Sequence, residues 1–575
     1  MSLNRIIPVL ITGLLLIWQP TVHAQSGQTG TITGRVVDAE TREPLVFANV
    51  MVEHTTIGTF TNMQGEYRLL NLRAGEIHIV ATVIGYKEGH QVVTVRAGQT
   101  DSLNFALEQT IMEIGTVVVT GTATPHLLED TPVRTEVIPR ILIERRQAPN
   151  LAEALSFHTG VRVENNCQNC NFSQVRILGM QGKYSQILID GDPVVSSLAS
   201  VYGLEHFPEE MVDQIEIVKG GGSALYGAGA VAGVINMITR RPMTNQVRIQ
   251  YRHHSTGGIP DPHLSAVAET VNSTGTSGAY VFGSTRRRSP YDHNGDGYSE
   301  LGSLKNESVG FKLYYKPQLE SEFLVSFHHI HEERRGGNKF DLPVHEADIA
   351  EWIEHWRSGG SIRWAQRTGP AFDYRLYYSY SIINRRSYFG GLDGETPEDQ
   401  LNALAFYGKS DNPLHLVGMQ ANYMIGAHLL TFGSQYSYDG LTDRTAAETA
   451  YYIDDAYSNT GLFVQDNLHI GPEKEIEFVF GLRLDKHSEL SDWIISPRLN
   501  GKFDLGGGFL LRGAYTTGFK PPQTYSEDLH LCGLEGDQRI IRNAAELREE
   551  RSNTISTGVE YLGRLKDMPA MASLT

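Results

Sequence analysis

The stretch at residues 214–242 constrains the fold of this chain more than any other. It reads QIEIVKGGGSALYGAGAVAGVINMITRRP. Two short apolar strands, at 215–218 and 234–239, flank a run made almost entirely of glycine, alanine and other small residues. Glycine adopts positive φ and lets one backbone pass close to another. The stretch therefore predicts a compact core built from tight turns.

The same letters resemble the end of the plug domain in TonB-dependent outer-membrane receptors. That family's signature runs I-E-V-x-R/K-G-x-x-S-x-x-Y-G-x-x-A-x-x-G-x-I-N-x-I-T, and Tyr226, Asn236 and the glycines are in register with it. Two further pieces, VRILG and QILIDGDP, resemble the family's R-I-R-G and V-L-I-D-G-x-P motifs. The resemblance implies a plug over residues 126–242. Arg176 and Asp190, one in each piece, are predicted to be ion partners inside it.

Length, charge and hydropathy limit the remaining classes. A chain of 575 residues predicts several domains, and its net charge of −17 argues against a nucleic-acid partner. Residues 1–24 have the positive start, apolar stretch and small-residue end of a secretory signal, with a membrane anchor as the alternative. Mean hydropathy is −0.26, and no later apolar run is long enough to span a bilayer as a helix. Any membrane-spanning part is therefore expected to be built from strands.

Residues 30–108 predict a small β-sandwich. Short alternating segments follow one another, separated by turn signals such as Gln64-Gly65 and Ala74-Gly75. The pattern resembles the carboxypeptidase-regulatory-like domain that often precedes the plug in these receptors. The resemblance implies a periplasmic spacer without catalysis.

Residues 113–122 begin with a glutamate and are otherwise uncharged and rich in β-branched side chains, which predicts a strand. This strand lies between the sandwich and the plug, where nothing in the sequence is expected to bury it. A free strand edge is a template for pairing with another chain. The strand resembles the TonB box, which implies pairing with TonB, energised by ExbB and ExbD. The alternatives are the last strand of the sandwich or a plain linker. The residues assigned to the box are Glu113, Ile114, Thr116, Val117, Val118, Val119 and Thr120.

From about residue 245 to 575 apolar and polar residues alternate in repeated strands, as in the piece FVFGLRLD. This texture is typical of an antiparallel transmembrane β-barrel, with a soluble all-β domain as the alternative. Roughly fourteen strands are recognisable, against about 22 in plugged outer-membrane transporters. The barrel is therefore expected to be of the 22-stranded type but incomplete, and the sequence to be truncated or frame-shifted at its C-terminal end.

Cys167 and Cys170 flank two polar residues within the expected plug and are followed by Asn171. In an exported chain this spacing favours a small disulfide loop. Direct contact with a ligand or metal, and unpaired thiols, stay open as alternatives. A CQNC loop at this place resembles a subgroup of receptors for iron complexes, haem or corrinoids, which implies that these three residues touch the ligand.

The run GFKPPQTYSEDLH at 518–530 resembles the F-R-A-P box of haem and related receptors, with Lys520 and Pro521 departing from it. In that family a histidine in the following loop ligates haem iron. The resemblance makes His530, with Tyr525 beside it, a candidate ligand contact. A solvated loop histidine is the alternative.

Residues 292–300, DHNGDGYSE, present oxygen ligands in the order of a calcium loop. Asp292, Asn294 and Asp296 stand at its first, third and fifth positions, and Glu300 stands at the ninth in place of an acid at the twelfth. We expect either a calcium site or a solvated acidic turn.

Together these features predict a mostly β protein with an N-terminal sandwich, an α+β plug and a transmembrane barrel. The family resemblance implies a receptor in the Gram-negative outer membrane, in contact with its lipids, that imports a scarce metal chelate using proton-motive force. The chelate is expected to be a ferric siderophore or haem, with cobalamin as the next choice, so the cargo would contain iron or cobalt. The resemblance also allows a surface lipoprotein partner. No catalytic pattern or required cofactor is found. An oligosaccharide receptor and a non-transporting truncated surface protein are the alternatives.

Overall fold

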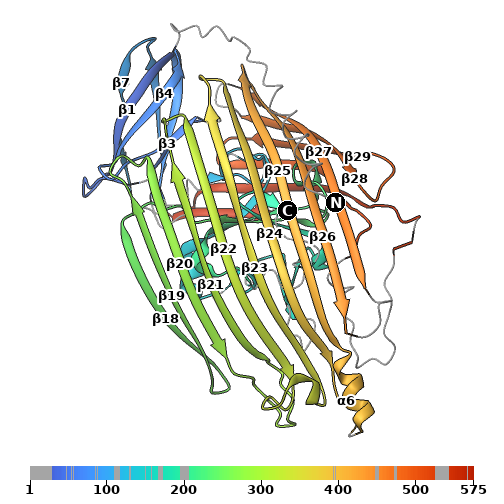
Figure 1. The fold of residues 1–575 in the computed structure, drawn as a ribbon. Coiled ribbons are helices and arrows are strands. Elements are labelled where there is room, and N and C mark those ends of the chain that lie inside the picture. Colours follow the sequence, from blue (N-terminus) through green and yellow to red (C-terminus); the bar gives the residue numbers. More distant parts are fainter. Residues whose placement is uncertain are drawn as a thin grey trace.

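The computed structural model describes residues 29–575 except for a set of gaps. The gaps are residues 47, 54, 56, 84–85, 87, 109–116, 129–130, 149, 157, 166–172, 194–197, 199–205, 393, 395, 447–451, 472–474, 525–542, 545 and 566–567. The described chain forms a small β domain, an α+β domain and one very large sheet that curves around the second of these (Figure 1). The predicted mostly β fold is confirmed.

The first domain is a sandwich of two four-stranded sheets. Alternating strands such as β1 bury every second apolar side chain, and Ile32, Leu69 and Ile79 are fully buried in the shared core. At one edge the His90 ring lies against the Glu53 and Glu88 carboxylates, and its hydrogen bonds to them raise the pKa of His90 to about 10. One sheet holds β1 (Thr29–Asp38), β4 (Glu66–Arg73), β7 (Thr100–Ser102) and β8 (Phe105–Leu107); the other holds β2 (Asn49–Val52), β3 (Gly58–Phe60), β5 (Gly75–Thr82) and β6 (Gly89–Val95).

The plug is organised around a five-stranded sheet in the order β11-β16-β17-β14-β15. Its central strands β16 and β17 are the two apolar strands of the glycine-rich stretch, and Ile215, Ile217 and Ile235 are fully buried in its core. The strands are β11 (Thr135–Pro139), β14 (Ser185–Ile189), β15 (Asp192–Pro193), β16 (Val212–Lys219) and β17 (Gly233–Thr239), with the hairpins β9 (Val117–Val118)/β10 (His126–Leu127) and β12 (Val161–Asn165)/β13 (Ser173–Ile177) beside them. The helices are α2 (Arg140–Arg146), α3 (Leu151–Leu155), α5 (Ser223–Tyr226) and the 3-10 turns η2 (Gly182–Tyr184) and η3 (Glu209–Met211).

The large sheet contains 15 strands, each hydrogen-bonded to the next along the chain, from β18 to β32. All of its described pairings are antiparallel, and β18 and β32 form its two edges. Short turns alternate with longer connections, one of which carries α6 (Pro397–Leu404) and another η4 (Val344–Glu346). The strands are β18 (Gln246–Thr256), β19 (Ile259–Val271), β20 (Ser277–Arg288), β21 (Ser303–Tyr315), β22 (Ser321–Gly337), β23 (Ala350–Arg367), β24 (Phe372–Gly390), β25 (Tyr407–Ile425), β26 (His428–Thr445), β27 (Ile453–Ile470), β28 (Ile476–His487), β29 (Ile494–Asp504), β30 (Phe509–Lys520), β31 (Glu550–Leu565) and β32 (Met568–Leu574).

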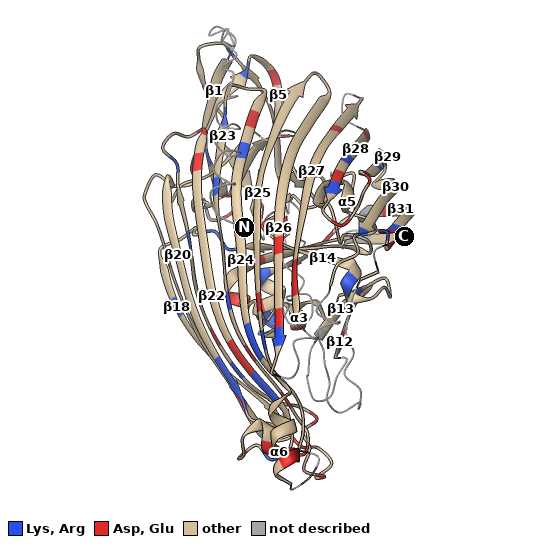
Figure 2. Cartoon of the chain, turned by 45° about the vertical axis from the view of Figure 1, so that its right-hand side comes forward, with Lys and Arg blue, Asp and Glu red and all other residues tan. Residues whose placement is uncertain are grey.

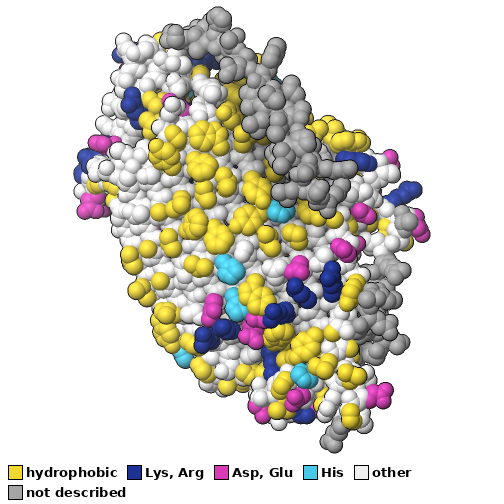
Figure 3. All heavy atoms as spheres, viewed as in Figure 1, with side chains coloured by type: hydrophobic (Ala, Val, Ile, Leu, Met, Phe, Trp, Pro, Cys, Tyr) yellow, Lys and Arg dark blue, Asp and Glu magenta, His cyan; other side chains and the backbone are white. Residues whose placement is uncertain are grey.

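The large sheet is apolar outside and polar inside, the reverse of a soluble β domain. On β25, Val417 and Met419 are 41% and 54% exposed, whereas Gln420 and Asn422 are 3% and 7% exposed. Apolar side chains cover much of its convex face (Figure 3). Charged residues occur on its strands toward the end that carries α6 (Figure 2). Strands that alternate apolar-out and polar-in are typical of membrane barrels. The alternative of a soluble all-β domain does not fit this pattern.

The described helices are short. Among the residues that the structure describes, no helix is long and apolar enough to cross a membrane. Helix α3 of the plug begins after Asn150, whose side chain accepts the Glu153 N–H.

The predicted ion pair between Arg176 and Asp190 is wrong. Arg176 is opposite Arg162 in the β12–β13 hairpin, and its guanidinium pairs with Glu164 of the same hairpin. Asp190 lies in the turn after β14, where it accepts hydrogen bonds from Thr239 and pairs with Lys312 of the large sheet at 3.1 Å. The aspartate therefore joins the plug to the wall around it.

Candidate functional site

The glycine run places the plug in direct backbone contact with the wall. A Cβ on Gly221 would lie 2.5 Å from the carbonyl carbon of Thr517 in β30, so no larger residue fits there without a shift. Gly220, with φ of +94°, makes the turn that leads into this contact. The predicted tight-turn core is confirmed, and its close neighbour is the wall of the large sheet.

Helix α5 and the turn that follows it are fixed to the wall by three hydrogen bonds. The Phe519 N–H donates to Ser223 Oγ at 3.0 Å, and the Gly229 N–H just beyond the helix donates to the Phe519 carbonyl at 2.9 Å. Arg483 Nη1, buried on β28, donates to the Leu225 carbonyl at 2.7 Å. The wall side of these contacts comes from two strands, β28 and β30, so the plug is attached to both of them.

The described part of the predicted TonB box does not lie free. Val118 and Thr120 are each only 1% exposed, and Thr122 and Thr124 just beyond them are equally buried. The expectation that nothing buries this strand is wrong, because the plug sheet covers one side of it and the inner wall covers the other. Glu113, Ile114 and Thr116 lie outside the described residues, whereas Val117, Val118, Val119 and Thr120 lie within them.

Glu216 of β16 holds this segment from the plug side. Its Oε2 accepts the Val119 N–H at 3.0 Å, the Thr120 N–H at 2.8 Å and the Thr120 hydroxyl at 2.5 Å. Gln214 Nε2 donates both to Glu216 Oε1 at 2.7 Å and to the Val117 carbonyl at 3.0 Å. One buried carboxylate therefore holds two successive residues of the segment, and hydrogen bonds to a charged acceptor are stronger than neutral ones.

Two other residues of the glycine-rich stretch also hold Thr120 by hydrogen bonds. Asn236 Nδ2 donates to the Thr120 hydroxyl oxygen, and the Tyr226 hydroxyl donates to the Thr120 carbonyl, both at 2.8 Å. Tyr226 and Asn236 are the residues that match the family signature. Burial raises the pKa of the Glu216 carboxyl, and the hydrogen bonds from Val119 and Thr120 oppose that rise.

The inner wall binds the next three residues of the chain, 121–123, through their backbone carbonyl groups. Arg498 Nη2 donates to the Gly121 carbonyl at 2.8 Å, Gln465 Nε2 to the Thr122 carbonyl at 2.8 Å, and Gln420 Nε2 to the Ala123 carbonyl at 3.0 Å. These three long polar side chains come from three strands, β29, β27 and β25. We call residues 117–124 the buried leader segment. It joins the sandwich to the plug and is bonded to both the plug and the wall.

A cleft of about 150 Å³ lies between the plug and the wall. The plug contributes Lys183 and Gly229, and the wall contributes Asp439, Asn459 and His487. The lining mixes charged, amide and imidazole groups, which suits a polar ligand with acceptor and donor groups on its surface. Of these five residues only Gly229 lies in a stretch that the sequence singles out.

The predicted ligand-contact residues Cys167, Cys170, Asn171, Tyr525 and His530 lie outside the described residues, and so does the predicted disulfide. The described chain nevertheless brings the F-R-A-P-like stretch to the cleft, because Pro521 and Gln523 form part of its lining.

The predicted calcium loop connects β20 to β21. Carboxylate oxygens of Asp292, Asp296 and Glu300 lie within 4.8 Å of one another. Asp292 also accepts the N–H groups of Gly295 and Gly297, and the Asn294 amide donates to Asp296 at 3.0 Å. The loop is therefore folded back on its own oxygens, with three of the four predicted residues converging.

Fold and site together define an outer-membrane-type receptor, in which a plug fills the inside of a strand wall. Comparison with family models agrees. The TonB-dependent Receptor Plug Domain matches residues 128–234, the CarboxypepD_reg-like domain matches residues 32–119, and the TonB dependent receptor-like beta-barrel matches residues 272–574. The barrel match alone covers more than half of the chain. The protein belongs to the TonB-dependent receptor family.

Individual relatives have low sequence identity to this chain, or match only a short part of it. The chain is 23% identical over 478 residues to the ferric enterobactin receptor PirA of Pseudomonas aeruginosa, covering 73% of this chain and 62% of that receptor. It is 33% identical over 131 residues to the vitamin B12 transporter BtuB of Vibrio vulnificus, covering 23% of this chain and 22% of the transporter. The crystal structure of the siderophore receptor PirA from Acinetobacter baumannii has a similar fold, with a TM-score of 0.60 at 17% identity, covering 75% of this chain and 68% of that one. The chain thus spans less than two thirds of the first of these curated relatives.

Proposed function

We propose that this protein is a receptor in the outer membrane that binds a metal chelate and imports it with energy relayed by TonB, ExbB and ExbD. The observation that carries the proposal is the buried leader segment. A strand that connects the periplasmic domain to the plug is bonded on one side to the plug, through Glu216, and on the other to the wall. Force applied to this strand acts on the plug directly.

The proposed cycle follows from these contacts. A chelate enters from the end that carries α6 and binds in the cleft between plug and wall. Binding changes the contacts of Lys183 and Gly229, which lie on the plug side of the cleft. The plug shift weakens the bonds between Glu216 and the leader segment, so that the strand at 113–122 becomes available for pairing with TonB. Pulling on that strand then moves the plug and opens a path for the ligand.

A ferric siderophore is the proposed cargo. Support comes from the similarity to ferric enterobactin and siderophore receptors over about three quarters of the chain. The polar lining of the cleft fits a chelate that carries many oxygen atoms. Cobalamin is a second candidate, favoured by the local similarity to a vitamin B12 transporter. Haem stays a third, resting on His530 and the F-R-A-P-like stretch.

Binding by the purified 575-residue chain in detergent tests the cargo. Ferric enterobactin, haem and cyanocobalamin would each be titrated while intrinsic fluorescence is followed. Asp439→Asn and His487→Gln change the cleft, and His293→Gln, at an exposed position in the loop at 292–300, is the matched control. We expect saturable binding of one ligand that both cleft variants weaken and the control leaves intact. Binding of none of the three, with the chain folded, would remove the metal-chelate assignment and bring oligosaccharides forward.

Two further sites are proposed. We propose that Cys167 and Cys170 form a disulfide in the exported protein, which mass spectrometry of a non-reduced digest would detect as a linked peptide. We also propose that Asp292, Asn294, Asp296 and Glu300 bind calcium. Calorimetric titration should show a calcium-binding event that disappears in a double variant, Asp292→Ala with Asp296→Ala, and equal heats in both proteins would contradict it.

A further inference from the structure

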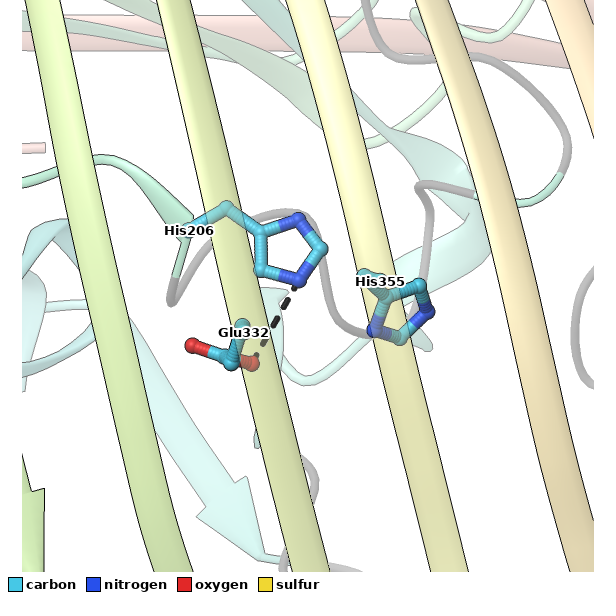
Figure 4. A group of neighbouring side chains, drawn as sticks. All are labelled: His206, Glu332 and His355. Atoms are coloured by element: carbon cyan, nitrogen blue, oxygen red, sulfur yellow. Dashed lines mark ion pairs between the residues drawn. The ribbon is translucent and has the colours of Figure 1, made fainter.

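Two histidines and a glutamate meet between the plug and the wall, away from the cleft and the leader segment. They are His206, Glu332 and His355, and Figure 4 shows the two rings and the carboxylate turned toward one another. One ligand-type atom from each residue lies within 4.8 Å of the other two, and each residue is 1% exposed. The His206 and His355 rings are 4.9 Å apart, edge to face.

The three residues come from three separate elements. Glu332 on β22 and His355 on β23 are direct partners in the antiparallel register, so both side chains point to the inside of the wall. His206 belongs to the plug and lies just before η3. The plug thus supplies one member of the cluster and the wall supplies two.

His206 is poorly satisfied by the protein alone. Neither of its ring nitrogens makes a hydrogen bond of normal geometry, and its Nε2 faces Glu332 Oε1 at 3.4 Å. Burying a polar group without a hydrogen-bond partner is costly, and native proteins rarely do it without a reason. Nothing in the proposed transport cycle uses this histidine.

The carboxylate is already oriented by two neighbours. Arg334 Nε donates to Glu332 Oε1 at 2.6 Å and Asn306 Nδ2 donates to Oε2 at 2.8 Å. Carboxylates that bind metals are commonly fixed in this way by outer partners, and each oxygen keeps a second lone pair. The charges of Arg334, beside Glu332, and of Arg385, near His355, oppose a cation here, so the two imidazoles have to contribute most of the binding.

We propose that His206, Glu332 and His355 form a site for a resident Zn²⁺ ion that fastens the plug to the wall. Two imidazoles and one carboxylate are a ligand set that Zn²⁺ takes in proteins, with a fourth position left for water. Oxygen-preferring cations such as Ca²⁺ and Mg²⁺ do not favour imidazole. The ion adds a bond between plug and wall, and so stabilises the seated plug. It is distinct from the imported chelate.

The test measures zinc bound by the full chain. Purified protein in detergent is stripped with a chelator, and Zn²⁺ alone is then titrated against a competing dye, with metal content checked by mass spectrometry. His206→Gln removes the plug ligand and His355→Gln removes a wall ligand. His328→Gln is the matched control, because His328 is a buried wall histidine beside Phe207, the residue next to His206. Zinc X-ray absorption on the loaded protein reports the ligand atoms.

We expect one zinc per chain, with an absorption spectrum typical of two imidazoles and a carboxylate. Either ligand variant should weaken binding by more than about 100-fold, beyond the 10- to 100-fold typical of outer partners, and the control should keep it. Zinc should also raise the unfolding temperature of the parent protein and of His328→Gln, but not of His206→Gln. Equal zinc binding by the parent and His206→Gln would overturn the proposal, as would a spectrum of oxygen ligands only, which would assign the ion to the loop at 292–300.

Discussion

Replacing Glu216 by glutamine tests how the leader segment is held. Glutamine has nearly the same volume but only one carbonyl oxygen. If that oxygen faces Val119 and Thr120, the new amide faces Gln214 Nε2, which is itself a donor and is held in place by its bond to the Val117 carbonyl. In the other orientation the three donors of Val119 and Thr120 lose their acceptor. No orientation satisfies every group.

The size of the effect follows from the hydrogen bonds. A bond to a charged acceptor contributes about 1.5–3 kcal/mol and a neutral one about 0.5–1.5 kcal/mol. The three bonds share one acceptor oxygen, so their losses are not additive, and losing charge assistance or the bonds themselves should weaken the hold on the segment by about 2–3 kcal/mol. That corresponds to roughly 30- to 150-fold faster amide exchange, because each 1.4 kcal/mol is tenfold.

Hydrogen-exchange mass spectrometry on the purified full chain measures this directly, in peptides that contain Val119 and Thr120. Glu136→Gln is the matched control, because Glu136 lies in the neighbouring strand β11 but pairs with His158 and Lys219 rather than with the leader segment. We expect faster exchange in Glu216→Gln alone. Unchanged exchange there, or an equal change in both variants, would refute the role given to Glu216.

Three further predictions concern the plug seat, the outer face and the sandwich. Gly221→Ala should destabilise the seated plug by about 1–3 kcal/mol because the added Cβ meets the backbone of β30. Gly513→Ala is the control, because a Cβ there meets open space. The urea concentration at which the plug loses half of its protection from a protease would show the difference. Met419→Arg on the apolar face should cost about 2–4 kcal/mol in urea unfolding from lipid vesicles, and Met419→Leu less than about 1.5; equal costs would contradict a lipid-facing position. The raised pKa of His90 stabilises the sandwich fully below pH 6.5, and this is lost as the pH rises through about 10. Because the ring is half exposed, the loss should be below about 1 kcal/mol, and His90→Gln should abolish the pH dependence of exchange protection in β5 and β6.

Local features were predictable where chain neighbours determine them. The strands β16 and β17 and the turn at Gly220 follow from apolar runs separated by glycines, and α3 follows from Asn150 and the short apolar run after it. The alternation along β25 likewise predicts a strand with one apolar face. In each case the residues that form the element are adjacent in sequence.

Contacts between distant parts were not predictable in this way. The leader segment is buried by Gln420, Gln465 and Arg498, which lie about 300 or more residues away in the sequence. The sequence shows that their strands have a polar face, but it does not show which part of the chain that face contacts. The zinc candidate was missed for the same reason. Glu332 and His355 become neighbours only through the β22–β23 register, and His206 reaches them only once the plug is inside the wall.

Uptake of ⁵⁵Fe-labelled ferric siderophore tests the central claim most directly. The chain would be expressed in a Gram-negative host that lacks its own siderophore receptors, with the TonB gene either present or deleted. The account predicts saturable uptake with TonB, and surface binding without accumulation when TonB is absent. Equal accumulation in both hosts, or accumulation that rises linearly with concentration, would contradict a plugged receptor driven through its leader segment.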